Sequence, residues 1–355
     1  MHATVREIEA FLQTAQHPLL VLLGPTASGK TAYSIALAHM LGQPEKKRGL
    51  WDRNIPVPQI HKVEIANADS RQLYRHLDIG TAKITPEEMQ GIPHHLIDVL
   101  DPKEEVTAAW FKQEVMRIIG EIHGRGNIPM LTGGSMLYIS AVIDNLEFVQ
   151  ESDPALRERL SGEYDRDAGV SLFRTLQKMD PESALSIDPR NKVYLIRAVE
   201  ICMLAQEKAS SLKTRALCPY DLLIMGLTLP REELHRRIND RVRRMFAAGW
   251  VEELRGLLAH GSTTDDPGLK SHGYREIAVA VRSGKLPFGP AVRGPEGLLM
   301  PEWEGPHALN GKVESTIEKT ELMEEIAAKT RQYAKRQMTW WRGDKRIRWM
   351  EAAND

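Results

Sequence analysis

The chain has 355 residues and a hydrophobic fraction of 42%, which suits one large globular domain or two smaller ones. Its formal net charge of −1 excludes a protein that coats nucleic acid indiscriminately, so any nucleic-acid surface must be a local patch. Two cysteines are too few for a disulfide scaffold or a four-cysteine zinc site. Because no apolar run approaches the roughly 18 residues of a membrane span and no signal-peptide core is visible, we expect no membrane partner and a cytoplasmic protein.

The first informative stretch is an apolar run at residues 19–23, which follows a short amphipathic helix pattern at 1–17 and predicts a buried strand. It leads into GPTASGKT, a complete match to G-x-x-x-x-G-K-[ST], and then into a helix pattern. In such a loop, backbone N–H groups and the helix N-terminus bind phosphate oxygens. We expect diphosphate binding by Gly24, Pro25, Thr26, Ala27, Ser28, Gly29, Lys30 and Thr31, with the Thr31 hydroxyl on Mg²⁺. The loop does not reveal what the diphosphate is attached to.

Asp69 follows the next predicted strand, residues 62–68. Ligands of open α/β sheets bind at the carboxyl ends of strands, so this carboxylate can hold Mg²⁺ or accept a proton. An N-cap role for the following segment is an equally good interpretation. Residues 70–83 are polar, and Lys83 is expected either to face an anion or to be solvated.

A second glycine turn follows the predicted helix at 110–122 and the predicted strand at 128–132. Its sequence is GGSMLY, and the Ser135 hydroxyl is a candidate substrate contact. This strand carries no acid at its end, where many nucleotide hydrolases keep a magnesium-binding aspartate, and that weakens an ATPase interpretation. His94 and His95 have no third metal ligand at a suitable spacing, so a structural pair in a loop is favoured.

Strand signals stop between residues 144 and 220. The pattern there predicts helices at 154–160, 170–179, 181–185 and 193–204. We therefore expect an α/β fold in which a parallel sheet flanked by helices forms a phosphate-loop catalytic core, and a helical insertion domain interrupts it. The expected core comprises residues 1–143 and 221–355, and the expected insertion comprises residues 144–220.

Strand character returns at 220–229, and an arginine-rich helix pattern follows at 231–249. Arg236 and Arg243 lie opposite its apolar stripe and should be solvated. Arginines at the border of the stripe can turn into a cleft, which makes them better candidates for phosphate binding. These border residues are Arg237, Arg241 and Arg244.

A last helix is predicted at 313–338 and leads into KRQMTWWRGDKRIRW. Basic residues interleaved with tryptophans suit an RNA backbone with stacked, unpaired bases. The alternative is a C-terminal strand that packs its tryptophans on the core. Residues 43–61 and 283–312 are rich in proline and read as long surface loops.

Together these segments resemble the tRNA dimethylallyltransferases. The resemblance rests on GPTASGKT, ADSRQLYRHLDIGTAK, IPHHLIDVLDP, LTGGSMLY, IRAVEI, REELHRRI, HGYREI and KRQMTWWR, which occur in the family's order from residue 24 to residue 342. It implies a monomer that transfers a dimethylallyl group from dimethylallyl diphosphate to N6 of the adenine at tRNA position 37, just 3′ of the anticodon. The tRNAs implied are those that read codons beginning with U.

The resemblance also implies roles for individual residues. Asp69 would accept the N6 proton, and Lys30, Thr31 and Ser135 would complete the catalytic set with Mg²⁺, while Arg237 and Arg241 would bind the diphosphate. The helical insertion would grip the anticodon stem-loop. The implied tRNA contacts are Asp69, Ser70, Arg71, Gln72, Ser135, Arg157, Arg197, Lys270, Gly273, Tyr274, Arg275, Lys335, Arg336, Gln337, Thr339, Trp340 and Arg342.

The sequence departs from the family pattern at Val193 and Tyr194, where relatives usually carry basic or amide side chains. Two other interpretations remain open at this level. A small-molecule kinase would use the same phosphate loop but needs a nucleoside triphosphate site and a mobile lid. A non-catalytic RNA-binding protein is disfavoured by the intact Lys30, Thr31 and Asp69.

Overall fold

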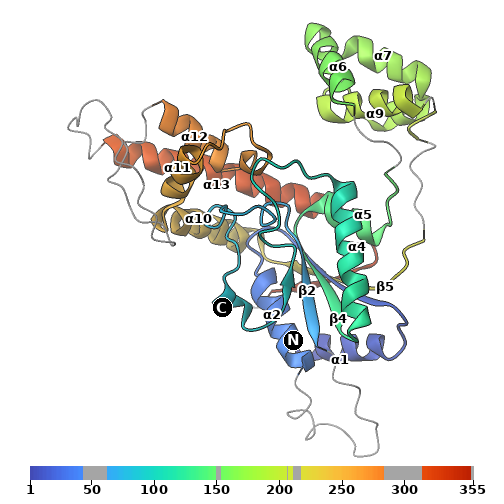
Figure 1. Ribbon diagram of the computed structural model, residues 1–355, viewed down its shortest axis with the longest axis vertical. Coiled ribbons are helices and arrows are strands. Elements are labelled where there is room, and N and C mark those ends of the chain that lie inside the picture. The colour runs from blue at the N-terminus through green and yellow to red at the C-terminus, as the bar shows by residue number, and fades with distance from the viewer. Residues whose placement is uncertain (43–61, 149–152, 206, 211–216, 284–313, 353–355) are drawn as a thin grey trace, which may run out of the picture. The chain divides into compact units, whose positions relative to one another are not determined.

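The computed structural model describes residues 1–42, 62–148, 153–205, 207–210, 217–283 and 314–352. Within it the chain forms two compact units (Figure 1): the first comprises residues 1–139 and 220–355, and the second comprises residues 140–219. The loops expected at 43–61 and 283–312 lie outside the described residues, apart from Ser283.

A six-stranded parallel sheet forms the centre of the first unit, with the strand order β3-β2-β4-β1-β5-β6. The strands are β1 (Pro18–Leu23), β2 (Val63–Ala68), β3 (His94–His95), β4 (Ile128–Gly133), β5 (Asp221–Thr228) and β6 (Ile347–Glu351). Every residue of β2 and β4 is buried, because helices cover both faces of a parallel sheet. The predicted α/β fold, with a parallel sheet flanked by helices, is confirmed.

Helices account for most of the remaining described residues of this unit. They are α1 (His2–Leu12), α2 (Lys30–Gly42), α3 (Pro86–Met89), α4 (Ala108–Gly124), α5 (Met136–Ile143), α10 (Arg231–Ala247), α11 (Trp250–Ala259), α12 (Tyr274–Arg282) and α13 (Glu314–Trp341), with a 3₁₀ turn at Pro267–Leu269. Helices α2 and α4 pack on β2 and β4, while α10, α11, α12 and α13 pack on one another (Figure 1). Helix α5 crosses the boundary into the second unit.

The second unit is helical throughout its described secondary structure. It contains α6 (Pro154–Asp167), α7 (Val170–Met179), α8 (Pro181–Ser186) and α9 (Lys192–Ala205). Helix α6 is longer than predicted. The prediction missed residues 161–167 because they are polar and lack an apolar repeat, and only Tyr164 among them packs against the core. The buried side chains of Leu160, Leu172, Leu195 and Val199 hold these helices together.

Two short helices, α11 and α12, were not predicted, and the last helix is longer than predicted. Helix α13 continues to Trp341, whose indole is buried, and the final strand begins only at Ile347. Segments as short as α11 give a weak periodic signal, and their stability comes from packing rather than from propensity. Among the described residues, no helix combines the length and apolar character that crossing a membrane requires.

The histidine pair forms part of the sheet and not of a loop. His94 and His95 make up the edge strand β3, and the His95 ring bonds Glu64 at 2.8 Å. Glu64 is buried, and its carboxylate also accepts from Arg125 at 3.0 and 2.8 Å and from Asn127 at 2.6 Å. Burial alone would raise the pKa of Glu64, but these hydrogen bonds lower it to about 2. The pair is therefore structural, as the spacing favoured.

We expect Glu64→Gln to lower the free energy of unfolding by about 1–3 kcal/mol at pH 7, since it removes a buried ionised acceptor and leaves its donors unmatched. Glu64 has a folded pKa below its ordinary value, so its stabilising contribution is present above about pH 4.5 and is lost as the pH falls toward 2. Urea unfolding of both proteins should give a difference that shrinks below pH 4.5. The exposed Glu105→Gln is the control, and a difference independent of pH would contradict the assignment.

Candidate active site

Three turns meet at the carboxyl edge of the sheet, because β2, β4 and β1 are consecutive parallel strands whose last residues are in register. The turn after β1 is the phosphate loop, the turn after β2 carries Asp69, and the turn after β4 is the second glycine turn. They line a cavity of about 1230 Å³ together with side chains of α10 and α13. Its walls include Lys30, Asp69, Arg237, Arg241 and Gln337.

The phosphate loop is already folded as an anion cradle. Gly29 has a φ of 87° and Ala27 a φ of 63°, so the chain turns through the left-handed region twice before α2 begins at Lys30. Ala27 does so at a cost of roughly 1–2 kcal/mol. The Thr31 side chain is exposed in the first turn of α2. The predicted strand, loop and helix are therefore all present, in the arrangement that anion binding needs.

Lys30 is half-buried in this loop and lines the cavity. Its Nζ donates to the Pro25 carbonyl at 2.7 Å. Desolvation is the main cause that lowers the pKa of Lys30 to about 8. The nearby carboxylate of Asp69 opposes this shift, and the Arg241 guanidinium adds to it. Desolvation also lowers the pKa of Arg241, and Asp69 again opposes that shift. Six lysine and arginine side chains and four carboxylates line the cavity, and this surplus of positive charge favours an anionic ligand.

Arg237 and Arg241 both face the phosphate loop side of the cavity, as predicted for border positions of α10. The Arg237 guanidinium lies close to Gly29, where an added Cβ would be 3.8 Å from Nη1, and its Nε donates to Glu233 at 2.6 Å. Arg241 donates from Nη2 to the Thr81 carbonyl at 3.0 Å. Arg236 is solvated as expected, with 64% of its side chain exposed.

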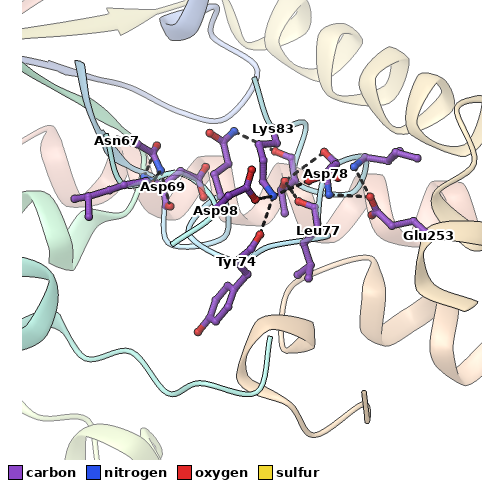
Figure 2. Close-up of polar contacts among 12 residues, drawn as sticks. Asn67, Asp69, Tyr74, Leu77, Asp78, Lys83, Asp98 and Glu253 are labelled. Carbon is purple, nitrogen blue, oxygen red and sulfur yellow. Dashed lines mark hydrogen bonds and ion pairs between the residues drawn. The ribbon is translucent and has the colours of Figure 1, made fainter. Parts of the chain in front are cut away.

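The Asp69 carboxylate is fixed by its own turn. Its Oδ1 accepts from the Arg71 N–H at 2.9 Å, and its backbone N–H donates to Asn67 Oδ1 at 3.0 Å. The Asn67 amide donates in turn to the Leu96 carbonyl at 2.9 Å (Figure 2). The turn therefore uses one carboxylate oxygen and leaves the other available to a ligand. Asn67 was not predicted, since an asparagine within a strand carries no distinctive sequence signal.

Ser135 joins the Asp69 turn to the second glycine turn. Its hydroxyl oxygen accepts from the Ser70 N–H at 2.8 Å, and its own N–H donates to the Ala68 carbonyl at 3.1 Å. The side chain is buried, which is compatible with a positioning role. Its predicted contact with substrate stays a prediction.

A buried cation supports the segment that leads away from Asp69. The expectation that Lys83 is solvated is wrong, because the side chain is buried. The anions that it faces are carboxylates of the protein: its ammonium donates to Asp78, to Asp98 and to the Tyr74 carbonyl (Figure 2). Two carboxylates and a carbonyl replace the lost water, as a buried charge requires. Sequence spacing alone could not pair Lys83 with Asp98.

Glu253 of α11 supports the same segment from the other side. Its carboxylate accepts from the backbone N–H groups of Asp78, Ile79 and Gly80, at 2.7, 2.6 and 3.1 Å respectively (Figure 2). The Tyr274 hydroxyl also donates to Glu253. Desolvation raises the pKa of Glu253, and these hydrogen bonds oppose that rise. The segment is thus held as a rigid wall of the cavity, and no sequence pattern indicated this role for Glu253.

The residues expected at the tRNA surface fall into exposed and buried groups. On α13 and just after it the exposed ones are Lys335, Arg336, Thr339, Trp340 and Arg342. Lys270 and Arg275 are exposed near α12, whereas Gly273 and Tyr274 are buried. Arg71 and Gln72 are half-buried and bond backbone carbonyls of Pro267 and Ala82.

Gln337 differs from its exposed neighbours. It is 1% exposed, and its carboxamide lies between the two glycine turns. The Thr26 N–H donates to Gln337 Oε1 at 2.8 Å, and Gln337 Nε2 donates to the Gly134 carbonyl at 2.7 Å. One helical turn earlier, the Tyr333 hydroxyl donates to the same carbonyl at 3.3 Å.

Arg157 and Arg197 belong to the second unit, where they share a buried partner. Glu200 is fully buried, and its Oε2 accepts from Arg157 Nε at 3.0 Å and from Arg197 Nη1 at 2.7 Å. Glu200 also accepts from the Asp153 N–H at 3.0 Å. The carboxylate therefore fixes both guanidinium groups at one place on this unit. A single glutamate within a helix pattern gives no sequence signal for such a role.

The oxygen donors of the cavity suit a Mg²⁺ ion that is shared with a ligand. Among the described residues, no three side chains of the types His, Cys, Asp and Glu group closely enough to hold a metal ion by themselves. The cavity instead offers the Thr31 hydroxyl, with Asp69 on its wall. Such a set fits Mg²⁺, which keeps several waters and is usually bound through one or two protein groups plus substrate phosphates.

Comparisons with known proteins agree on one family. The model of the family described as IPP transferase matches residues 72–344. The tRNA dimethylallyltransferase of Symbiobacterium thermophilum is 38% identical, over 94% of this chain and 89% of its own length, and that of Thermomicrobium roseum is 36% identical, over 94% and 86%. The solved tRNA isopentenylpyrophosphate transferase of Bacillus halodurans is 32% identical with a TM-score of 0.60, covering 95% of this chain and 90% of its own.

The lowered pKa of Lys30 predicts that diphosphate binding depends on pH. The cationic form, which attracts the anion, dominates below about pH 8 and is lost above it. We expect the Kd of the wild-type protein for inorganic diphosphate, measured by calorimetry, to rise between pH 7.5 and 9.5 relative to that of Lys30→Met. The variant provides the control because it shares the titration of the ligand itself. Parallel pH profiles for the two proteins would contradict the assignment.

Proposed function

The chain belongs to the IPP transferase family, and from that premise we propose that it transfers a dimethylallyl group from dimethylallyl diphosphate to a tRNA. The acceptor we propose is N6 of the adenine at position 37, 3′ of the anticodon, in tRNAs that read codons beginning with U. The observation that carries the proposal is the single cavity in which a phosphate loop, two desolvated cations and the Asp69 carboxylate meet. It has a place for a leaving diphosphate and a base for the incoming amine.

The phosphate loop would hold the leaving group and not a nucleotide. The bond between the allylic carbon and the diphosphate oxygen breaks as the bond between N6 and that carbon forms, so negative charge grows on the diphosphate. Lys30 and the arginines Arg237 and Arg241 would stabilise that charge in a site shielded from water, where such interactions are strongest. The Thr31 hydroxyl and the diphosphate oxygens would hold Mg²⁺, which supplies further charge neutralisation when bound.

Asp69 would take the proton that N6 loses. An exocyclic amine is a weak nucleophile that must shed a proton as the new C–N bond forms, so a positioned carboxylate contributes to the rate at that step. Its Oδ1 is bonded to the Arg71 N–H, and the other oxygen is the proposed acceptor. The adenine has to leave its stack to reach this depth, as bases do for other enzymes that modify them.

The exposed face formed by Lys335, Arg336, Thr339 and Trp340 on α13 would bind the RNA. An exposed tryptophan among cations suits stacking on an unpaired base next to a phosphate backbone. The arginine pair of the second unit, Arg157 and Arg197, would bind the anticodon stem as the resemblance implies. A small-molecule kinase, the alternative considered from the sequence, is not favoured by the family to which the chain belongs.

Label transfer tests the function directly. The purified protein is incubated with Mg²⁺, labelled dimethylallyl diphosphate and an unmodified tRNA that has adenine at positions 36 and 37, beside the same tRNA with guanine at position 37. Label in the first tRNA alone is the expected result. No label in either tRNA, together with ATP binding, would overturn the proposal in favour of the kinase.

We expect Asp69→Asn to reduce turnover by about 10²–10⁴-fold while tRNA affinity stays within about threefold, because asparagine cannot accept the proton. Asparagine keeps an acceptor for the Arg71 N–H, so the turn should persist. Single-turnover kinetics and filter binding measure the two quantities. Near-normal turnover would remove Asp69 from the role of base.

We expect Trp340→Ala to weaken tRNA binding by about 5–100-fold, the loss that corresponds to one stacked base, and to leave diphosphate affinity unchanged. Filter binding and calorimetry measure the two affinities. Glu321→Ala, an exposed residue of the same helix that is not among the proposed RNA contacts, controls for general disturbance of α13. Unchanged tRNA affinity in Trp340→Ala would show that this indole does not stack on the RNA.

A further inference from the structure

Helix α13 has two faces with different surroundings near its C-terminus. Tyr333, Gln337 and Trp341 follow one another at intervals of four residues and point inward, with Gln337 and Trp341 almost fully buried. Arg336 and Trp340 follow the same interval on the exposed face. The helix therefore touches the catalytic loops with one side and presents cations and an indole with the other.

The Gln337 carboxamide uses both of its ends to join the two glycine turns. Its oxygen accepts from the Thr26 N–H of the phosphate loop, and its nitrogen donates to the Gly134 carbonyl of the second turn. An added Cβ at Gly134 would come within 2.5 Å of this nitrogen and 3.6 Å from the Gly24 carbonyl oxygen. The two turns thus approach each other closely, and the carboxamide fills the space between them.

The bond to Thr26 acts at a critical point of the phosphate loop. The next residue, Ala27, has a φ of 63°, a conformation that L-residues other than glycine adopt only when the surroundings hold them there. The Thr26 N–H belongs to the peptide between Pro25 and Thr26, whose carbonyl accepts from Lys30 Nζ, so the Gln337 bond holds the loop one residue before Ala27. The Ser28 N–H donates to the Pro25 carbonyl at 3.3 Å, and the other N–H groups up to the start of α2 at Lys30 are in position to cradle an anion.

The bond to Gly134 removes an electrostatic obstacle. The Gly134 carbonyl lies at the cavity wall, and a carbonyl oxygen repels an anionic ligand unless donors neutralise it. Both Gln337 and Tyr333 donate to it. Neither residue needs to contact the ligand to have this effect.

We propose that Gln337 is a positioning residue for the diphosphate: its carboxamide holds the phosphate loop in its anion-binding shape and masks the Gly134 carbonyl. This role replaces the direct tRNA contact expected at this position, and it rests on the proposed function. At 1% exposure, with its oxygen and its nitrogen both bonded to the backbone, Gln337 offers almost no surface to an RNA base.

The first test separates the two substrates. Wild type, Gln337→Leu and Gly134→Ala are compared by the Kd for inorganic diphosphate with Mg²⁺ and by the KM values for dimethylallyl diphosphate and tRNA. Leucine removes both hydrogen bonds at similar volume, and the alanine methyl displaces the carboxamide from its other side. Both variants should raise the diphosphate constants about tenfold or more, with the tRNA KM within about twofold of wild type.

Thr330→Ala serves as the matched control on the same helix, because it removes a hydroxyl that donates to the Ile326 carbonyl within the helix. It should leave all constants unchanged. If Gln337→Leu instead raises the tRNA KM and leaves the diphosphate constants unchanged, Gln337 is an RNA contact and the proposal is wrong. If no variant moves either constant, the proposal is wrong as well.

A second test uses a conservative variant that titrates. In Gln337→Glu a protonated carboxyl can accept from Thr26 and donate to Gly134, while an ionised one can only accept and repels the diphosphate. Burial raises the pKa of such a carboxyl, so the change should fall between about pH 5 and 8. The ratio of the variant's Kd to that of wild type should drop as the pH falls, and a constant ratio would contradict the positioning role.

These measurements distinguish the proposal from the function on which it rests. If wild type binds diphosphate and Gln337→Leu loses that affinity, but no label reaches tRNA, the proposed function fails and the positioning role stands. If label reaches tRNA normally in Gln337→Leu with unchanged diphosphate constants, the positioning role fails and the function stands.

Discussion

The burial of Lys30 beside Asp69 and Arg241 is the constraint on which the site depends. A lysine ammonium that loses its water is less stable as a cation, and its pKa falls to about 8. Asp69 opposes that fall, but the cavity is lined by six lysine and arginine side chains and only four carboxylates. The lining therefore has a surplus of positive charge, which favours an anionic ligand. The fold has to hold these three groups close together even though part of their interaction is unfavourable.

Side chains around the site hold Lys30, Asp69 and Arg241 together through hydrogen bonds to the backbone of the loops. The segment that follows Asp69 is fixed by Lys83, which belongs to it, and by Glu253, which lies on α11. Ser135 fixes the beginning of the same segment. Gln337 joins the phosphate loop to the second glycine turn. Each of these side chains is largely withdrawn from solvent, where a hydrogen bond is worth most and an unmade one costs most. The carboxyl edge of the sheet is thus preorganised, so little loop ordering remains to oppose binding of an anion in the cavity.

The sequence allowed the strands β1, β2, β4 and β5, the phosphate loop and most helices to be predicted, because each depends on a local pattern. The run at residues 19–23 and the glycines at 24 and 29 are examples, as is the stripe that sends Arg237 and Arg241 toward the cavity. The supporting contacts were not predicted, because they join residues far apart in the chain. Lys83 was expected to be solvated or to face an anion, since nothing local pairs it with Asp98. Neither Glu253 nor Asn67 has a motif.

Amino-acid composition alone could not predict that Trp340 and Trp341 lie in different surroundings. The sequence left two interpretations for this segment, RNA contact and packing on the core. The burial of Trp341 suits packing on the core, and the exposure of Trp340 suits RNA contact. Trp341 is buried, and Trp340 is 44% exposed. A helix separates adjacent residues by about 100°, so one tryptophan can anchor α13 while its neighbour faces solvent. The same geometry puts Gln337 inside and Arg336 outside, so α13 contacts the phosphate loop with one side and exposes Arg336 and Trp340 on the other.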